Sequence, residues 1–314
     1  MASALFAVFL VAVFYFICRE LVGVGAASFA TILFAFESLN FVQSQLAMLD
    51  VFSVTFMLLA FLLYIKNRHV LSGLSIALSG LCKMPGLLGI LPILAYWFLS
   101  KRRQPLKNVI FLSISAVLGF IIMMMVFDLA ATHAWADPFT RISTMIHKGS
   151  ALTVSKLTTP EAQMVSFPWE WVLSPIGHLN FKQVGAATFI SPTVWVLIIP
   201  SMCYMLYDYF RNKTDVSLFA LLWFGSTYLL WIPLQLLTDR QTYLYYFYPS
   251  IGAVCLAISY ATSRIWSMTS QQRCARYRFT LLVVVGGYVI LHLLVFLVLA
   301  IWAPNQVSMK PLIP

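Results

Sequence analysis

The sequence predicts an all-α, polytopic integral membrane protein of about ten transmembrane helices, with one long external loop that bears short amphipathic helices. Of its 314 residues, 61% are hydrophobic and only 10% are charged, whereas soluble domains have roughly 45–50% apolar and about 25% charged residues. This composition excludes a soluble protein, a disordered tail and a nucleic-acid-binding module. We therefore interpret the net charge of +10 as a signal of membrane topology.

Ten apolar segments predict the helices: 3–18, 22–40, 48–65, 70–82, 85–99, 107–127, 186–207, 216–237, 243–263 and 279–303. No positive residue precedes the first segment, which argues against a secretory signal peptide. Segments 70–82 and 85–99 are shorter than a span requires and meet at Lys83-Met-Pro-Gly86. They predict tilted helices, or a helix that stops within the membrane.

The segments divide the chain into three regions. Residues 1–127 are expected to form about six N-terminal helices, and residues 186–314 about four C-terminal ones. Residues 128–185 form the only long polar stretch in the sequence. Within it, Phe139, Ile142, Met145 and Ile146 share one helical face, which is typical of a helix lying on the membrane surface.

The positive charges predict the orientation. The loops at 19–21, 65–69, 100–107, 208–215 and 264–278 contain 13 of the 20 Lys and Arg residues, so this side is expected to be cytoplasmic. Both termini and the long loop then face outside, where most of the acidic residues also lie. We expect a multi-pass protein of the cell membrane, or of the endoplasmic reticulum in a eukaryote, with an extracytoplasmic active face.

The cysteines and histidines give no sign of a metal site. No Cys-x-x-Cys pair or zinc-like spacing is present, and the histidines in or beside the long loop lack a ligand motif such as H-E-x-x-H. We assign no metal. Three cysteines within apolar segments are interpreted as packing residues: Cys18, Cys203 and Cys255.

Three charged residues at the predicted external edge are candidates for chemistry. Asp50 opens an apolar helix, where it either complements the helix dipole or serves a functional site. Lys83 is either a snorkelling lysine or a cation for an anionic head group. Arg240 precedes an aromatic run at 243–248, so it belongs to an interfacial belt or grips a phosphate with two N–H groups. Trp169 and Trp171 are membrane anchors or part of a substrate surface.

Four stretches together resemble the dolichyl-phosphate-mannose–protein mannosyltransferase family, inverting glycosyltransferases of the GT-C fold. They are Ser44-Gln45-Leu-Ala-Met-Leu-Asp50, Gly80-Leu-Cys-Lys-Met-Pro-Gly86, Asp137-Pro-Phe-Thr-Arg141 through Pro168-Trp-Glu-Trp171, and Arg240 through Pro249. The resemblance covers the chain from about residue 10 onward. Two departures matter: Gln45 stands where the family has Arg, and the family's first span and its external loop with an Asp-Glu pair have no counterpart.

The resemblance implies transfer of mannose, or another hexose, from a polyprenyl or dolichyl phosphate to Ser/Thr hydroxyls of proteins on the external face. It implies that Arg240 and Lys83 contact the donor phosphate and that Asp50 organises the site. Trp169, Trp171, Arg141 and His147 would line the acceptor or sugar region. The general base would come from an upstream segment, so this chain alone would bind donor but turn over poorly.

The expected partners are membrane lipid, the polyprenyl-phosphate sugar and a protein acceptor, with a dimer mate or an upstream-encoded partner chain as a further expectation and no nucleic acid. The lipid-phosphate sugar is a substrate, so no cofactor is expected, although a divalent metal stays an alternative. Three other functions stay open: a GT-C transferase acting on a lipid or glycan acceptor, a non-enzymatic lipid transporter or flippase, and a remnant without activity. The single interrupted helix region has no counterpart later in the chain, which is unlike the paired interruptions of transporters.

Overall fold

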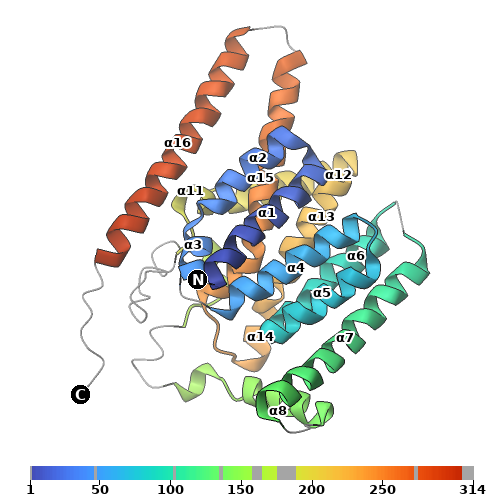
Figure 1. Cartoon of the computed structure of the whole chain (residues 1–314). Coiled ribbons are helices and arrows are strands. Elements are labelled where there is room, and N and C mark those ends of the chain that lie inside the picture. Colours follow the sequence, from blue (N-terminus) through green and yellow to red (C-terminus); the bar gives the residue numbers. More distant parts are fainter. Residues whose placement is uncertain are drawn as a thin grey trace.

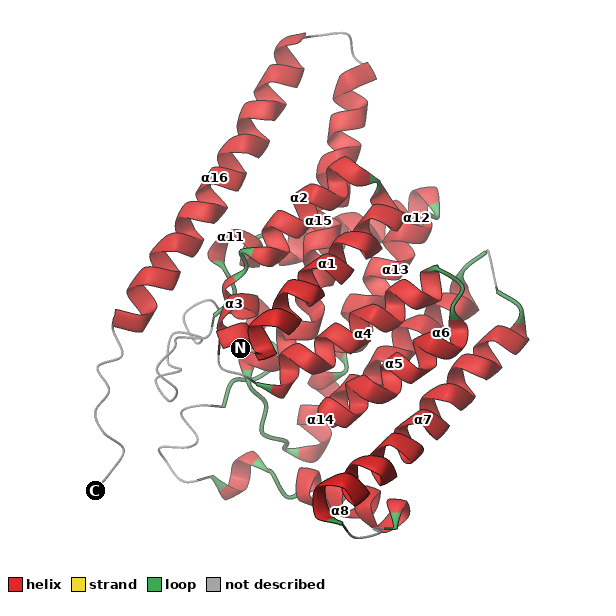
Figure 2. Ribbon diagram, in the orientation of Figure 1, coloured by secondary structure: helices red, strands yellow, loops and turns green. Residues whose placement is uncertain are grey.

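A computed structural model describes residues 2–45, 48–101, 104–133, 137–157, 165–174, 189–271 and 275–305. Helices dominate this described part, and its one extended pairing is a single backbone bridge between Thr153 and Arg240. The helices gather into a bundle, with the last helix lying along one side (Figures 1 and 2). The all-α prediction is therefore confirmed.

The first half of the chain forms helices at the predicted segments, except that segment 22–40 is divided into two helices bent by 56°, a second interruption besides the one predicted after segment 70–82. The helices are α1 (Ala2–Val22), α2 (Val24–Ala35), α3 (Ser38–Gln45), α4 (Leu49–Ile65), α5 (His69–Cys82), the 3-10 helix η1 (Met84–Gly89), α6 (Ile90–Leu99) and α7 (Leu106–Thr132). The predicted interruption after segment 70–82 is confirmed, because α5 ends at Cys82 and a 3-10 turn separates it from α6.

The second half begins with short elements and ends with two long helices. They are α8 (Pro138–Ser150), η2 (Val154–Lys156), α10 (Glu170–Leu173), α11 (Pro192–Trp195), α12 (Ile198–Asn212), α13 (Asp215–Phe224), the π-helical turn η4 (Gly225–Leu229), α14 (Trp231–Thr238), η5 (Leu244–Phe247), α15 (Tyr248–Gln271) and α16 (Ala275–Asn305). Residues 186–188 of the predicted segment 186–207 lie outside the described residues.

Six helical stretches in the described part are long and apolar enough to cross a membrane, or seven if α2 and α3, bent by 56°, form one span. The protein is thus an integral membrane protein. Three shorter apolar helices, Leu49–Ile65, His69–Cys82 and Met84–Leu99, coincide with predicted segments 48–65, 70–82 and 85–99. The total of ten spans stays a prediction.

Close helix contacts, more than burial from water, hold such a bundle together, because lipid tails are as apolar as the side chains themselves. Gly73 of α5 illustrates this. A Cβ placed there would lie 2.9 Å from the backbone nitrogen of Ala116 on α7, which is too close for any side chain. At the centre, Trp223 packs edge-on against Phe61 at 5.3 Å and its indole N–H donates to the Pro249 carbonyl at 2.8 Å.

The bend between α2 and α3 is stabilised by a buried carboxylate. Glu37 accepts backbone N–H groups from Leu39 (2.6 Å), Asn40 (3.1 Å) and Ser191 (2.7 Å). A broken helix within a membrane needs partners for its freed N–H groups, and Glu37 supplies them. It also ties this bend to the segment just before α11.

The amphipathic helix predicted in the long loop is present as α8. Asp137 caps its first turn by accepting the Thr140 N–H at 2.7 Å, and this bond lowers the pKa of the Asp137 carboxyl. Its apolar residues Ile142 and Met145 pack against the cluster of Phe120 and Met124 on α7. The helix lies across the end of α7 (Figure 1), and its place on a membrane surface stays a prediction.

Helix α16 has little contact with the bundle. Only 6% of an 18-residue apolar stretch within Arg276–Val298 is buried. His292 is its main buried polar contact, and its ring nitrogens lie 2.6 Å from Thr193 Oγ1 and 3.2 Å from the Leu33 carbonyl oxygen. Cys18 and Cys255 are buried as predicted, but Cys203 is exposed. The packing role predicted for Cys203 is wrong, because it lies on the outer face of α12.

Candidate functional site

Asp50 and Lys83 come from different helices and form an ion pair. Asp50 lies in the first turn of α4, and Lys83 occupies the extended residue between α5 and η1. The Lys83 ammonium donates to both Asp50 oxygens, at 2.7 and 2.8 Å. It also lies 4.4 Å from the ring centroid of Tyr245 and 5.1 Å from that of Tyr246. The Asp50 carboxylate therefore balances the charge of this lysine, and the two aromatic faces stabilise it further.

The turn that presents Lys83 depends on a glycine. The Gly86 N–H donates to the Lys83 carbonyl at 2.7 Å, which closes the turn around Pro85. A Cβ at Gly86 would collide with the hydroxyls of Ser53 and Ser79 and would lie 2.5 Å from the Ser79 carbonyl oxygen. The absence of a side chain at Gly86 lets the turn approach α4 and α5, and so places Lys83 beside Asp50.

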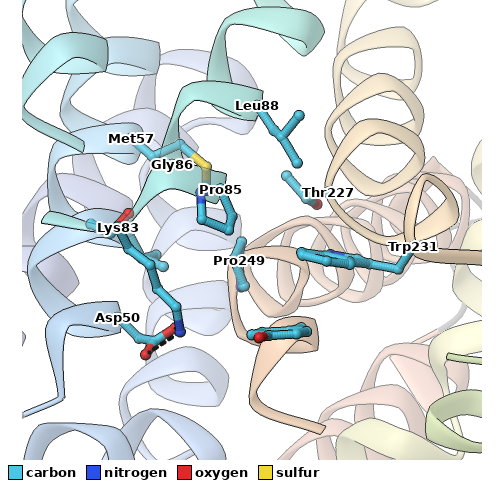
Figure 3. Close-up of a pocket in the computed structure, with 12 residues that line it drawn as sticks. Asp50, Met57, Lys83, Pro85, Gly86, Leu88, Thr227, Trp231 and Pro249 are labelled. Carbon is cyan, nitrogen blue, oxygen red and sulfur yellow. Dashed lines mark hydrogen bonds and ion pairs between the residues drawn. The ribbon is translucent and has the colours of Figure 1, made fainter. Parts of the chain in front are cut away.

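A small cavity adjoins this ion pair. Its volume is about 30 Å³, and Pro85, Thr227 and Trp231 are among its lining residues. Figure 3 shows Asp50 and Lys83 pointing toward each other, with Trp231 across the hollow. Since one water needs about 10–15 Å³, the cavity has room for two or three waters and is too small for a hexose.

A larger groove lies on the other side of the same turn. It has a volume of about 520 Å³. Met84 of η1 lines it, whereas the adjacent Lys83 and Pro85 line the small cavity. The other lining residues come from α8, α14 and the segment after α14, namely Met145, Ile146, Lys148, Gly149, Ser150, Leu234, Thr238 and Arg240.

Arg240 is held in the wall of this groove by backbone pairing. Val154 N–H donates to the Asp239 carbonyl at 2.8 Å, and Gln241 N–H donates to the Leu152 carbonyl at 3.0 Å. The Asp239 carboxylate accepts the Ser155 N–H at 2.9 Å, so it fixes the turn instead of pairing with the guanidinium. The residues flanking Arg240 are therefore fixed to the segment that follows α8.

The guanidinium of Arg240 has N–H groups that are not used in hydrogen bonds to the described residues. One terminal nitrogen, Nη1, donates to the Gly149 carbonyl at 3.2 Å. Its Nε is buried and has no hydrogen-bond acceptor among the described residues. Lys148 lines the same groove, and no Asp or Glu is among the described lining residues. Two cations, apolar walls and a buried unused donor match an anionic group attached to an apolar chain.

The remaining predicted residues lie outside this groove. Arg141 on α8 pairs with the buried Asp128 of α7 at 3.1 Å, and this ion pair joins the two helices. His147 is exposed on α8. Trp169 stacks on Phe167 with centroids 5.0 Å apart.

Trp171 lies in the core. It is fully buried and its indole N–H donates to Ser166 Oγ at 2.9 Å. Ser166 in turn exchanges backbone and side-chain hydrogen bonds with Thr242. Trp171 thus anchors the segment 165–174 beside Arg240 and presents no face to an acceptor.

Sequence reasoning missed several members of this region. Trp231 stacks on Tyr246 at 4.5 Å, and both line the small cavity. Asp128 and Glu37 are buried acids whose only sequence signal is a carboxylate within or at the end of an apolar segment. In the described residues, no group of three or more His, Cys, Asp or Glu side chains could hold a metal ion.

No protein-family model matches the chain, and no curated protein matches it either. Among solved structures, the chain is similar to the Archaeoglobus fulgidus oligosaccharyltransferase in its apo form, with 16% identity and a TM-score of 0.46. It is also similar to the archaeal oligosaccharyltransferase AglB from Archaeoglobus fulgidus in complex with an inhibitory peptide and a dolichol-phosphate, with 13% identity and a TM-score of 0.49.

Each of these comparisons covers 98% of this chain and 44% of the other. The chain therefore spans less than half the length of either protein. With TM-scores below 0.5, the likeness is too distant to assign a family, and the functional proposal rests on the residues described above.

Proposed function

We propose that this chain belongs to a membrane glycosyltransferase of the GT-C type that uses a polyprenyl-phosphate sugar as donor. The observation that carries the proposal is the groove of about 520 Å³ in which Arg240 and Lys148 meet apolar residues of η1, α8 and α14. A phosphate fits the two cations, and a polyprenyl chain fits the apolar walls. The groove lies beside α8, the amphipathic helix expected at the membrane surface, where such a lipid has its head group.

The reaction proposed is displacement at the anomeric carbon of the donor. An acceptor hydroxyl oxygen forms the new bond to that carbon, and the bond from the carbon to the phosphate oxygen breaks. The polyprenyl phosphate leaves with the electron pair, and the hydroxyl proton passes to a base. Arg240 and Lys148 stabilise the charge that grows on the leaving phosphate.

Lys83, expected from the sequence to contact the donor phosphate, is a positioning residue in this scheme, because its ammonium is paired with Asp50 and it does not line the groove. Asp50 is a positioning residue as well, since this ion pair, together with Gly86, fixes the turn whose Met84 lines the groove. We propose mannose as the sugar and Ser/Thr hydroxyls of an external protein as acceptors, because the order and spacing of the four sequence stretches resemble the dolichyl-phosphate-mannose–protein mannosyltransferase family. Trp169, Arg141 and His147, which are on the loop side of the bundle, are the proposed acceptor region, and Trp171 holds that region in place.

Donor binding tests the phosphate assignment. The purified full chain is titrated with polyprenyl phosphate in detergent, alongside Arg240→Ala and Arg240→Lys. A charge-assisted hydrogen bond contributes about 1.5–3 kcal/mol, so Arg240→Ala should weaken binding about 10- to 100-fold. Arg240→Lys should recover part of it, since it keeps the charge but not the planar guanidinium. Unchanged binding by Arg240→Ala would reject the assignment.

Transfer tests the reaction class. The full chain in liposomes is given polyprenyl-phosphate [¹⁴C]mannose and a Ser/Thr-rich peptide, and label is followed in peptide, in lipid-linked products and across the bilayer. Label in the peptide supports the proposed reaction. Label in a lipid or glycan product overturns the protein acceptor, and movement of intact donor across the bilayer without transfer overturns the enzyme in favour of a transporter.

A further inference from the structure

A second groove lies at the opposite end of α15 from Arg240. Its volume is about 320 Å³, and it is lined by Gly25 and Phe29 of α2, Thr262 and Trp266 of α15, and Leu282 and Val285 of α16, among others. Thr262 lies about 14 residues along α15 from Tyr248, roughly 21 Å away along the helix axis. Figure 1 shows α15 and α16 diverging beside α2 in this part of the molecule.

Each hydroxyl side chain that lines this groove already donates a hydrogen bond to a backbone carbonyl. Thr262 Oγ1 donates to the Ile258 carbonyl at 2.8 Å, and Ser263 Oγ donates to the Tyr260 carbonyl at 2.8 Å. Ser259 Oγ donates to the Ala26 carbonyl and so joins α15 to α2. With its hydroxyls already paired, the groove suits an apolar chain and not a polar solute.

There is also open space beside Gly25, one of the lining residues. No atom lies within 4 Å of a Cβ built on Gly25. Leu282 is 56% exposed on the opposite wall. Because α16 has so little contact with the other helices, an occupant of this groove would supply packing that the protein itself does not.

The charges that α15 and α16 bring to the groove are all positive, and the nearby acids on other helices are already paired: Glu20 with Lys66, and the buried Asp208 with Tyr260. Residues 240–314 contain no Asp or Glu. Arg264 lies about two turns before the end of α15, and Arg276 and Arg278 lie in the first turn of α16. Arg278 lies one helical turn from Leu282 and therefore shares its face of α16, and Arg276 is exposed in the first turn. Trp266, which is 40% exposed, is the kind of residue that marks a membrane interface.

We infer that this groove binds an anionic glycerophospholipid, with an acyl chain between α2, α15 and α16 and the phosphate at Arg276 and Arg278. The lipid would come from the leaflet predicted to be cytoplasmic, where anionic lipids attract basic segments. Bound there, it would brace α16 against the bundle. This site is separate from the proposed donor groove and does not depend on the enzymatic function.

Native mass spectrometry of the full chain tests this inference. The delipidated protein in detergent is mixed with phosphatidylglycerol or with phosphatidylcholine of the same acyl chains, and retained lipid is measured. Each cation near a head group should raise the affinity for an anionic lipid about fivefold. Two cations should therefore give roughly a 30-fold preference for phosphatidylglycerol over phosphatidylcholine. Arg276→Gln with Arg278→Gln should abolish this preference. Lys107→Gln, at an exposed cation on the same predicted side, should leave it unchanged.

Substitutions at two glycines test whether the lipid occupies the groove. Gly25→Leu should narrow the groove and reduce retention of phosphatidylglycerol at least fivefold. Gly287→Leu is the matched control, because Gly287 on α16 also has no atom within 4 Å of a built Cβ and does not line the groove. Circular dichroism and gel filtration verify that each variant is folded. Equal retention of the two lipids by the unaltered chain, or full retention by folded Gly25→Leu, would overturn the inference. Arg240→Ala should retain phosphatidylglycerol normally, which separates this site from the donor groove.

Discussion

The two partners of the Asp50–Lys83 ion pair should contribute unequally to stability. Removing the lysine should lower the free energy of unfolding more than removing the charge of the aspartate. The Asp50 side chain is 8% exposed and that of Lys83 24%. Without Lys83, the Asp50 carboxylate keeps no other hydrogen-bond donor among the described contacts. Without the Asp50 charge, Lys83 still lies over two tyrosine rings and still reaches water.

The magnitudes follow from this geometry. Removing one partner of a fully buried pair costs about 3–5 kcal/mol. Because Lys83 is partly exposed, we expect the lower end, about 3 kcal/mol, for Lys83→Met. Asp50→Asn should cost about 2 kcal/mol, since the rings retain a cation–π contribution of about 1 kcal/mol. The double variant should cost less than the sum, with a coupling energy of about 2 kcal/mol.

The assay is equilibrium unfolding of the two single variants and the double variant in mixed micelles of dodecylmaltoside and dodecylsulfate, followed by circular dichroism. The reasoning is refuted if Asp50→Asn destabilises as much as Lys83→Met. It is also refuted if the two single costs simply add, because the side chains would then not be coupled in the folded protein.

Two further predictions concern the turn at Gly86 and the helix α8. Gly86→Ala should destabilise by about 1–3 kcal/mol through overpacking against Ser79, measured by the same unfolding assay, and a cost near zero would show that the turn has room. The pKa of Asp137 is lowered by the Thr140 N–H, so the cap stabilises α8 above the ordinary carboxyl pKa of about 3.9 and is lost as pH falls through the lower folded value. In an NMR titration, the Asp137 carboxyl carbon and the Thr140 amide should share a midpoint below about 3.9, and a midpoint at or above that value would contradict the capping bond. Asp137→Asn keeps an acceptor and should remove the pH dependence.

Local features of the fold were predictable from the sequence because they depend on neighbouring residues. The apolar segments give the helices, and Pro85 with Gly86 gives the interruption after α5. The spacing of Phe139, Ile142 and Met145 gives α8. Each of these signals lies within one or two helical turns of the chain.

Long-range contacts were not predictable in the same way. Asp50 and Lys83 were recognised separately, but nothing in the sequence states that they pair across two helices. Trp171 looked suited to an exposed surface, yet its hydrogen bond to Ser166 and its full burial depend on elements far along the chain. Cys203 lies in an apolar segment, and in a membrane protein such a position is as compatible with facing lipid as with facing the core.

The central claim is that the groove beside Arg240 binds a polyprenyl phosphate. Photocrosslinking of that lipid to the groove tests it most directly. A polyprenyl phosphate that carries a photoreactive diazirine near its phosphate is bound to the full chain. The complex is irradiated, and the labelled peptides are identified by mass spectrometry. The account predicts labelling at Met84, Met145, Ile146 or Leu234, suppressed by excess unlabelled polyprenyl phosphate and by Arg240→Ala. Labelling spread evenly over lipid-facing helices such as α16, and unaffected by Arg240→Ala, would contradict it.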